Sequence, residues 1–358
     1  MEVMKVCQAF IEIGHEIRLW VPGPPASRDA EHIHRLYGLR ESVPIQWLRV
    51  IGPARHYDFA LRACVAARAW GADWLYLWPL QAAALAALMR WPFALELHDR
   101  PGGRVAPKLM GRILHARGKK RLLPITDALR TWLENHFGVE LNPPDTVVLP
   151  SGVDLHQYQD LPPAPEARRS LGLAERFTAG YTGHLYPGRG MPLLLALAER
   201  NPEIQFVWAG GEPEAIESWS RRLEASGVGN VRMLGFVPNQ ELPLVQAACD
   251  VLLMPYEERV AVSSGGDTAA FASPMKLFEY LASGRAILSS DLPVLREILN
   301  PANAMLLPPA DIEAWDGALK EIMGDPGRRE ALARRARQDA LRYDWRARAR
   351  RALEGLHD

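Results

Sequence analysis

The strongest constraint on the fold is the alternation of short apolar runs with segments whose apolar residues recur at helical spacing. Buried strands are predicted at such runs, among them 74–78, 93–97, 122–125, 178–182, 205–209 and 251–255. Helices are predicted between them, among others at 127–136 and 193–200. Strands that alternate with helices form parallel sheets covered by helices on both faces. The sequence therefore predicts an α/β protein with doubly wound sheets.

A proline-rich segment divides the alternating pattern into two series. The chain of 358 residues is long enough for two domains of ordinary size. Residues 157–172 contain three closely spaced prolines and are predicted to be a linker. The first lobe would then span 1–156 and the second 173–339, with a cleft between the lobes.

The first predicted element is a helix near residues 4–11, and a strand at 17–21 follows it. A sheet built from strand–helix–strand units normally starts with a strand near its centre. Two explanations are open for the first lobe. Either the fold tolerates the absence of that strand, or the sequence begins downstream of the true start.

Composition narrows the functional classes. Lys plus Arg (42) equals Asp plus Glu (42), so no overall basic charge argues for nucleic acid as a partner. The three cysteines are scattered without metal-ligand spacing, and we interpret them as reduced core thiols of a cytosolic protein. The longest uncharged stretch, 74–89, contains Pro79 and is too short to span a bilayer. A cytoplasmic protein is predicted, with peripheral attachment at the inner face of the membrane left open.

The segment 272–293 carries the clearest signal for a ligand. Ser273 is predicted to cap the free N–H groups of a helix whose first residue is Pro274, and Gly284 stands where a C-terminal cap belongs. The N-terminus of such a helix favours an anion, and phosphate is the usual one. Glu279 lies six residues along, roughly 9 Å at 1.5 Å per residue, which is about the reach from a diphosphate to a ribose. The alternative interpretation is an ordinary amphipathic helix between two strands.

Several motifs together resemble one enzyme family. In the second half they are TGHLYPGRGMPLLLALAER, VWAGGEPEAI and SPMKLFEYLASGRAILSSDLPVLREIL, and in the first half they are ELHD and LPSGVDLHQY. The chain resembles the GT-B glycosyltransferases, in particular glycosyltransferase family 4, over nearly its whole length. The resemblance implies two Rossmann-like lobes that face each other across a cleft, with the C-terminal helix at 340–358 packing back on the first lobe. It also implies transfer of a glycosyl group from a nucleotide sugar, normally with retention at the anomeric carbon and without a bound metal ion.

By this resemblance, the second lobe binds the donor. Gly183, His184 and Arg189 would face the diphosphate on a glycine-rich loop, where Arg189 would also be catalytic, because a departing nucleoside diphosphate needs fixed positive charge. His184 replaces the more usual arginine and would be a weaker or pH-dependent donor. At the helix start, the implied donor-binding residues are Ser273, Pro274, Met275, Lys276 and Leu277, followed by Glu279 for the ribose hydroxyls. Arg189 as a solvated loop cation and Lys276 as a surface lysine are the alternatives.

One position departs from the family pattern. Phe271 stands where the first glutamate of a Glu-x7-Glu motif is usual, which removes the usual contact to the donor sugar. A non-catalytic or truncated nucleotide-sugar-binding subunit is therefore a second hypothesis, which the missing first strand also motivates. Neither lobe shows Gly-x-Gly-x-x-Gly after a strand with an acidic residue about 20 positions later, which argues against a nicotinamide-dependent oxidoreductase. No cofactor is expected, and the co-substrate would be a UDP- or GDP-sugar.

In the first lobe, His98 follows a predicted strand and by resemblance lies near the transferred sugar as a catalytic residue. A nearly neutral imidazole would suit hydrogen bonding to sugar hydroxyls. The alternative is a core histidine paired with Asp99. Thr126 and Asp127 resemble a cleft-facing position or cap a helix, and the turn at 151–154 resembles a hinge between the lobes.

A run of basic residues in the first lobe has two interpretations. It comprises Arg112, His115, Arg117, Lys119, Lys120 and Arg121. It could hold an acceptor, a glycan or lipid-linked glycan of polysaccharide biosynthesis, at an anionic membrane surface. The other interpretation is a solvated helix face.

Overall fold

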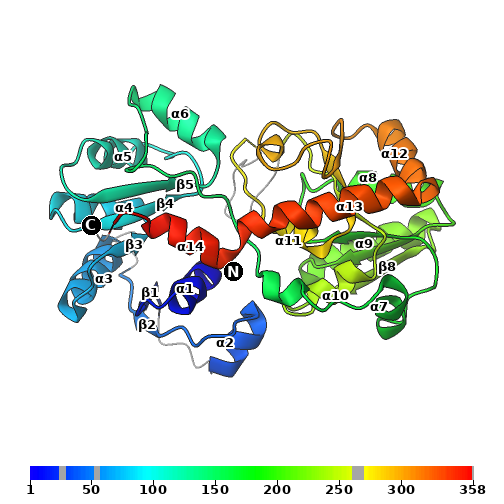
Figure 1. Cartoon of the computed structure of the whole chain (residues 1–358), viewed down its shortest axis with the longest axis horizontal. Helices are drawn as coiled ribbons and strands as arrows, with labels where there is room; N and C mark the ends of the chain where they lie inside the picture. The colour runs from blue at the N-terminus through cyan, green and yellow to red at the C-terminus, as the bar shows by residue number, and fades with distance from the viewer. Residues whose placement is uncertain (24–29, 52–56, 260–269, 357–358) are drawn as a thin grey trace. The chain divides into compact units, whose positions relative to one another are not determined.

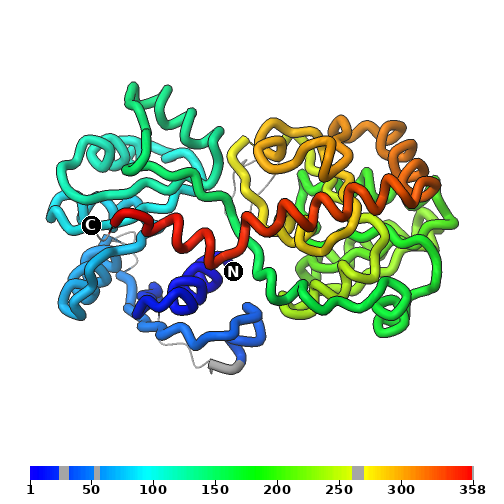
Figure 2. The backbone as a smooth tube through the Cα atoms, viewed as in Figure 1, coloured from blue at the N-terminus to red at the C-terminus, as the bar shows by residue number. Residues whose placement is uncertain are grey.

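The computed structural model describes residues 1–23, 30–51, 57–259 and 270–356. It contains two compact units. Unit 1 is formed by Met1–Pro150 together with Trp345–Asp358, and unit 2 is Ser151–Asp344. Figure 2 traces the chain from blue to red, and its last segment returns to the blue and cyan unit.

Unit 1 is built from twelve described helices and strands. In chain order they are α1 (Glu2–Glu12), β1 (Leu19–Pro22), α2 (Ala30–Tyr37), β2 (Ile45–Leu48), α3 (Tyr57–Trp70), β3 (Leu75–Leu77), α4 (Leu80–Leu88), β4 (Phe93–Leu97), α5 (Ala106–Leu114), β5 (Lys120–Pro124), α6 (Asp127–Phe137) and α14 (Trp345–Leu353). All strand pairs are parallel, in the two sheets β1-β2 and β3-β4-β5. An apolar cavity of about 540 Å³ is lined by residues of β1 and β3, together with α1 and α3. The last helix, α14, packs against the first, α1 (Figure 1).

The described residues of unit 2 form one six-stranded parallel sheet. Its elements are a 3-10 turn (Leu155–Tyr158), α7 (Ala164–Ser170), β6 (Thr178–Thr182), α8 (Met191–Arg200), β7 (Gln205–Ala209), α9 (Pro213–Ser226), β8 (Val231–Gly235), α10 (Leu242–Ala247), β9 (Val251–Met254), α11 (Met275–Ser283), β10 (Ala286–Ser290), a 3-10 turn (Leu295–Glu297), β11 (Met305–Leu307), α12 (Ile312–Gly324), α13 (Pro326–Ala340) and a 3-10 turn (Leu341–Tyr343). The strand order is β11-β10-β9-β6-β7-β8. This order places β6 and β9 side by side at the centre, so the loops after them lie close together.

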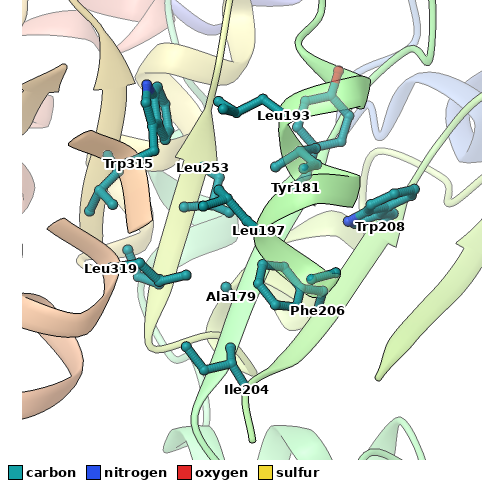
Figure 3. Close-up of a cluster of buried hydrophobic side chains, with 14 of the residues drawn as sticks. Ala179, Tyr181, Leu193, Leu197, Ile204, Phe206, Trp208, Leu253, Trp315 and Leu319 are labelled. Atoms are coloured by element: carbon teal, nitrogen blue, oxygen red, sulfur yellow. The ribbon is translucent and has the colours of Figure 1, made fainter. Parts of the chain in front are cut away.

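Strand alternation explains why helices cover both faces of this sheet. Successive side chains of a strand point to opposite faces. Val251 and Leu253 of β9 therefore belong to one core cluster, whereas Leu252 and Met254 belong to another. The first cluster is completed by α8 and α12, as Figure 3 shows with Leu197 and other labelled side chains. Residues of α11 and α13 complete the second cluster. The predicted doubly wound α/β architecture is confirmed.

The segment predicted as a linker is part of unit 2. Within 157–172, Tyr158 and Ala167 are buried in core clusters, and residues 164–170 form α7. Arg168 is buried, donates to the Ala248 carbonyl over 2.9 Å and pairs with Asp250. Prolines at the start of a short helix explain the error, because proline is favoured in the first helical turn as well as in linkers.

The C-terminal segment predicted as one helix at 340–358 is interrupted. Helix α13 ends at Ala340, a short 3-10 turn follows, and α14 begins at Trp345. The break separates a helix of unit 2 from a helix of unit 1. Among the described residues, no helix combines the length and the apolar character needed to span a membrane.

Candidate functional site

The loop after β6 is fixed by glycines that approach other backbone segments closely. Gly183 donates its N–H to the Ala209 carbonyl over 2.8 Å, and a methyl group added at Gly210 would lie 2.3 Å from the Gly183 oxygen. At the other end of the loop, Gly190 has φ +72°, and a methyl group there would lie 1.8 Å from the Pro255 oxygen. Only glycine fits these contacts without displacing backbone. The loop therefore packs against the ends of β7 and β9.

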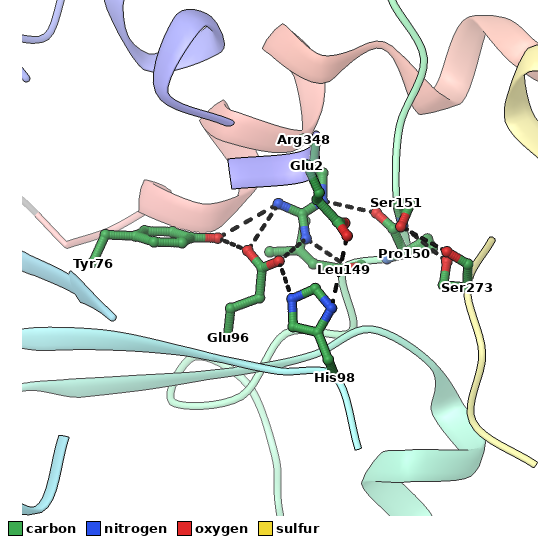
Figure 4. A network of polar contacts seen from close by, with 9 residues as sticks. All are labelled: Glu2, Tyr76, Glu96, His98, Leu149, Pro150, Ser151, Ser273 and Arg348. Atoms are coloured by element: carbon green, nitrogen blue, oxygen red, sulfur yellow. Dashed lines mark hydrogen bonds and ion pairs between the residues drawn. The ribbon is translucent and has the colours of Figure 1, made fainter. Parts of the chain in front are cut away.

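Helix α11 begins one residue later than predicted. Its N-cap is Pro274, and no side chain caps the free N–H groups. The Ser273 hydroxyl instead accepts the Ser151 N–H over 2.9 Å, while Ser151 donates its own hydroxyl to the Ser273 carbonyl over 2.7 Å (Figure 4). The capping role predicted for Ser273 is therefore wrong, and the helix start keeps its backbone donors uncapped by a side chain. Gly284 ends the helix in the left-handed conformation, as predicted.

Lys276 is the most unusual side chain of unit 2. It is buried, and its ammonium group has no hydrogen-bond partner among the residues that the structure describes. The Nζ atom lies 4.0 Å from the ring centre of Tyr181 and 4.6 Å from that of Tyr256. Burial, together with the charge of Arg189, holds the pKa of Lys276 well below its usual range. The interpretation of Lys276 as a solvated surface lysine does not fit this burial.

Arg189 lies on the loop after β6 and, like Lys276, faces the ring of Tyr256. Its Nη1 donates to the Tyr256 hydroxyl over 2.5 Å, and its guanidinium lies 4.8 Å from the Tyr256 ring centre. Its Nε is buried without a described partner. His184 stacks on Tyr186 with ring centres 4.8 Å apart, and burial and the charge of Arg189 lower the pKa of its imidazole. A pKa lowered from the usual 6.5 leaves the His184 imidazole mostly neutral at pH 7.

Glu279 follows Lys276 by one turn of α11. Residues three apart lie on the same face of a helix. The Glu279 carboxylate is largely buried and accepts a hydrogen bond from Asn239 over 3.3 Å. Of the other predicted donor residues, Leu277 is buried in the core, whereas Pro274 and Met275 are partly exposed. Phe271, which stands in place of the first motif glutamate, is buried.

A second polar cluster lies in unit 1, at the carboxyl end of β4 (Figure 4). Glu96 accepts hydrogen bonds from the Tyr76 hydroxyl and from Arg348 over 3.2 Å, and its Oε1 lies 2.7 Å from Nε2 of His98. Nδ1 of His98 lies 3.7 Å from the Glu2 carboxylate. His98 is thus oriented by Glu96 and Glu2, and the alternative pairing of His98 with Asp99 is not what the structure shows.

No metal ion is needed to account for this cluster. Glu2, Glu96 and His98 offer one ligand atom each within 4.8 Å of one another. However, both oxygens of Glu96 already face donors, and Arg348 supplies the compensating charge. A cationic neighbour of this kind does not suit a second cation.

Other predicted residues of unit 1 have structural roles. Thr126 caps α6, because its hydroxyl accepts the Leu129 N–H over 3.2 Å. Within the basic run, Arg121 is buried and donates to the carbonyls of Ala352 and Glu354. Lys120 donates to two carbonyls at the end of α5, over 2.9 and 2.6 Å. These two cations are not available to a membrane surface.

Sequence reasoning did not identify the tyrosines of unit 2 or Arg348. Tyr256 lies two residues after the end of β9, and a polar aromatic residue near the carboxyl end of a strand is a usable signal for a ligand site. Tyr181 and Arg348 carry no such signal, since each occupies an ordinary position of a strand or of an arginine-rich helix.

Comparison with known proteins supports one family. Residues 171–325 match the family model described as glycosyl transferases group 1. The chain is 24% identical over 364 residues to the phosphatidyl-myo-inositol mannosyltransferase of Mycolicibacterium smegmatis, covering 96% of this chain and 85% of that protein. It is 27% identical over 269 residues to the D-inositol 3-phosphate glycosyltransferase of Kineococcus radiotolerans, covering 70% of this chain and 60% of that protein.

Solved structures share the fold at low sequence identity. HepE of Anabaena, crystallised with UDP and glucose, has a TM-score of 0.75 and 18% identity, covering 99% of this chain and 95% of that chain. WaaG, a glycosyltransferase of lipopolysaccharide biosynthesis, has a TM-score of 0.64 and 16% identity, covering 99% and 94% respectively.

Proposed function

We propose that the chain is a glycosyltransferase that transfers a sugar from a nucleoside-diphosphate sugar, because its residues 171–325 match the model of glycosyl transferases group 1 and its relatives are named glycosyltransferases. In this proposal, unit 2 binds the donor, the transfer retains the configuration at the anomeric carbon, and no metal ion takes part. The observation that carries the proposal is Lys276, whose buried amino group has no described hydrogen-bond partner.

The diphosphate is the group that such a site would take. Lys276 and Arg189 are basic groups held beside Tyr256, and each has a buried nitrogen without a described partner. Leaving a charged group unpaired in a buried place is costly, so an anionic ligand would stabilise both groups. The N-terminus of α11 and the neutral imidazole of His184 would add hydrogen-bond donors. Fixed positive charge at this place would stabilise the departing nucleoside diphosphate and take over the role of a metal ion.

The ribose would be held one helical turn further. The carboxylate of Glu279 can accept hydrogen bonds from two hydroxyl groups, and Asn239 holds its orientation. A turn of helix rises about 5.4 Å, so Lys276 and Glu279 would contact different parts of one nucleotide. This division leaves the donor sugar itself to other groups, since Phe271 offers it no polar contact.

The donor and acceptor classes follow from the relatives. HepE binds UDP and UDP-glucose, and a Corynebacterium glutamicum relative 27% identical over 207 residues is named as GDP-mannose-dependent. UDP- and GDP-sugars are therefore the first donors to test. Two relatives are named for acting on phosphatidyl-myo-inositol or its mannosides, and we propose a glycan or lipid-linked acceptor here, with His98 near the transferred sugar. Peripheral membrane contact would then rely on the basic residues of unit 1 other than Lys120 and Arg121.

Isothermal titration with UDP and GDP, in the presence of a chelator, tests the nucleotide site. Arg189→Ala, Lys276→Met and Glu279→Ala should each weaken nucleotide binding about tenfold or more, since a hydrogen bond to a charged group contributes about 1.5–3 kcal/mol. Matched controls are Arg221→Ala and Glu217→Ala on α9, whose side chains are both 71% exposed. Equal affinity in the site variants and the controls would refute the assignment.

Turnover is a separate measurement. Transfer from the donor that binds, followed by product analysis for anomeric configuration, tests the reaction itself. Activity that persists in a chelator supports the metal-free mechanism, and activity that only a divalent cation restores would overturn it. Arg189→Ala should reduce kcat as well as donor affinity, because the charge that it would neutralise grows as the leaving group departs.

A further inference from the structure

A buried ion pair in unit 1 has no part in the donor site described above. It joins Glu96 of β4 to Arg348 of α14 over 3.1 Å, and both side chains are almost completely buried. Arg348 is itself fixed by two backbone carbonyls, with 2.8 Å from Nε to Pro150 and 3.2 Å from Nη2 to Leu149 (Figure 4). Buried ion pairs of this kind are weak evidence for stability, since apolar side chains can replace them at little cost. Because Glu96 of this pair lies beside His98, the pair affects the imidazole.

The pair fixes the charge state of Glu96. Burial raises the pKa of the Glu96 carboxyl, but the charge of Arg348 and the hydrogen bonds from His98 and Tyr76 outweigh it and lower the pKa to about 2. Glu96 is therefore a carboxylate at neutral pH, and a carboxylate is acceptor-only. The nitrogen that faces it, Nε2 of His98 at 2.7 Å, must carry a proton.

The second nitrogen of His98 also faces an acid. Nδ1 lies 3.7 Å from the carboxylate of Glu2 on α1. The charged groups around the imidazole are thus Glu96 on β4, Glu2 on α1 and Arg348 on α14. Burial lowers the pKa of His98, as does the charge of Arg348, but the hydrogen bond to Glu96 and the two carboxylates raise it above its usual value in sum. The expectation of a nearly neutral imidazole does not fit these surroundings.

We propose that Glu96 is a positioning residue that holds His98 as a doubly protonated imidazolium, and that Arg348 and Tyr76 act by keeping Glu96 charged and in place. The His98 side chain is 38% exposed, so it can still contact a ligand. In this form His98 is a cationic hydrogen-bond donor and cannot serve as a general base. Its place in sugar transfer rests on the proposed function, whereas its charge state does not.

The charge state can be measured without any substrate. An NMR titration of the protein with labelled histidine, with the His98 signal assigned by its loss in His98→Asn, gives the pKa directly. The expected value for the natural chain is above the usual 6.5. In Glu96→Gln the pKa should fall by about one unit or more, since an opposite charge within hydrogen-bonding distance shifts a pKa by about 1–3 units.

Two further variants guard against misfolding. The double variant Glu96→Gln with Arg348→Met removes both buried charges, and proteins commonly tolerate the replacement of a whole buried ion pair. This variant should lower the pKa of His98 in the same way. Glu2→Gln removes only the more distant carboxylate and should give a smaller fall. A pKa of His98 at or below 6.5 in the natural chain, or one that does not move in the double variant, would overturn the proposal.

The pH dependence of sugar transfer separates this proposal from the proposed function. If His98 acts as a cation, transfer should decline as pH rises through its pKa, and the decline should begin at lower pH in the double variant. Loss of nucleotide binding in the unit 2 variants tests the proposed nucleotide site. An unchanged His98 titration in the same variants would show that the charge state of His98 does not depend on that site. An identical pH profile in the natural chain and the double variant would remove the role of Glu96 in transfer.

Discussion

Gly190→Ala tests whether the loop that carries Arg189 is held by close contact or merely by its conformation. Gly190 has φ 72° and ψ 22°, and Gly227, at the end of α9, has φ 70° and ψ 16°. An alanine at either position incurs nearly the same left-handed strain, about 1–2 kcal/mol before the smaller gain from a stiffer unfolded chain. Around Gly227 an added methyl group has nothing within 4 Å, so Gly227→Ala should lose only about 1 kcal/mol of unfolding free energy.

At Gly190 a steric conflict adds to the strain. The added methyl carbon would lie 1.8 Å from the Pro255 oxygen, and real contacts do not fall below 3.0 Å, so the two segments must separate by at least 1.2 Å (3.0 minus 1.8). Overpacking of this kind costs about 1–3 kcal/mol or more. We therefore expect a total loss of about 2–4 kcal/mol in Gly190→Ala, out of the 5–15 kcal/mol typical of a domain.

Urea unfolding, followed by tryptophan fluorescence, measures both variants. Trp208, Trp219 and Trp315 report on unit 2 because all three lie in its core. Gly190→Ala should also weaken binding of UDP or GDP, since Arg189 moves with the loop, whereas Gly227→Ala should bind as the natural chain does. Equal losses of stability in the two variants would show that the loop relaxes freely and would refute the reasoning.

Three further predictions concern stability and reactivity. Burial raises the pKa of each cysteine thiol to about 11 or 12, so mass spectrometry at pH 8 should find little labelling by iodoacetamide in the native protein and three labels after unfolding, at Cys7, Cys64 and Cys249. Burial raises the pKa of Asp316, but hydrogen bonds from Lys320 and Asn201 outweigh it and lower the pKa below 3.8. The resulting stability is present above about pH 4 and is lost at lower pH, so the difference in unfolding free energy between the natural chain and Asp316→Asn should shrink as pH falls below 4. Arg168→Met leaves Asp250 without its cation and should cost about 1.5–3 kcal/mol in urea unfolding, and adding Asp250→Asn should recover part of that loss.

Local patterns were sufficient to predict most of unit 2. The strands β6, β7 and β9 are buried along their whole length, and the uninterrupted apolar run of β9 (VLLM) is typical of a strand covered on both faces. The end of α11 at Gly284 was predictable because a left-handed residue at that position strongly favours glycine. Glycines in the loop after β6 were equally informative. The sequence did not predict that these glycines make close contacts with Pro255 and with Gly210, because those contacts depend on strands that are distant in the sequence.

Contacts between distant segments account for what the sequence did not predict. Ser273 has the composition of an N-cap, but Ser151, 122 residues away, takes its hydroxyl. His98 next to Asp99 suggested a local pair, whereas the carboxylate that orients the imidazole is Glu96, which in turn depends on Arg348, 252 residues away. Side-chain partners of this kind follow from the fold and not from spacing along the chain. The helix at 30–37 and the short strand at 45–48 were not predicted, and in the described part of the chain this strand pairs with β1.

The return of α14 to unit 1 affects the order in which the protein can fold as it is made. A ribosome completes Met1–Pro150 long before it reaches Trp345, and domains usually fold in the order of their synthesis. Until the segment from Trp345 onward is made, Glu96 lacks its partner Arg348, and Arg121 lacks the carbonyls of Ala352 and Glu354. All of Ser151–Asp344 emerges before those partners do. The second half of the chain is therefore free to reach its native state first, and the first half becomes complete only when the last helix has left the ribosome.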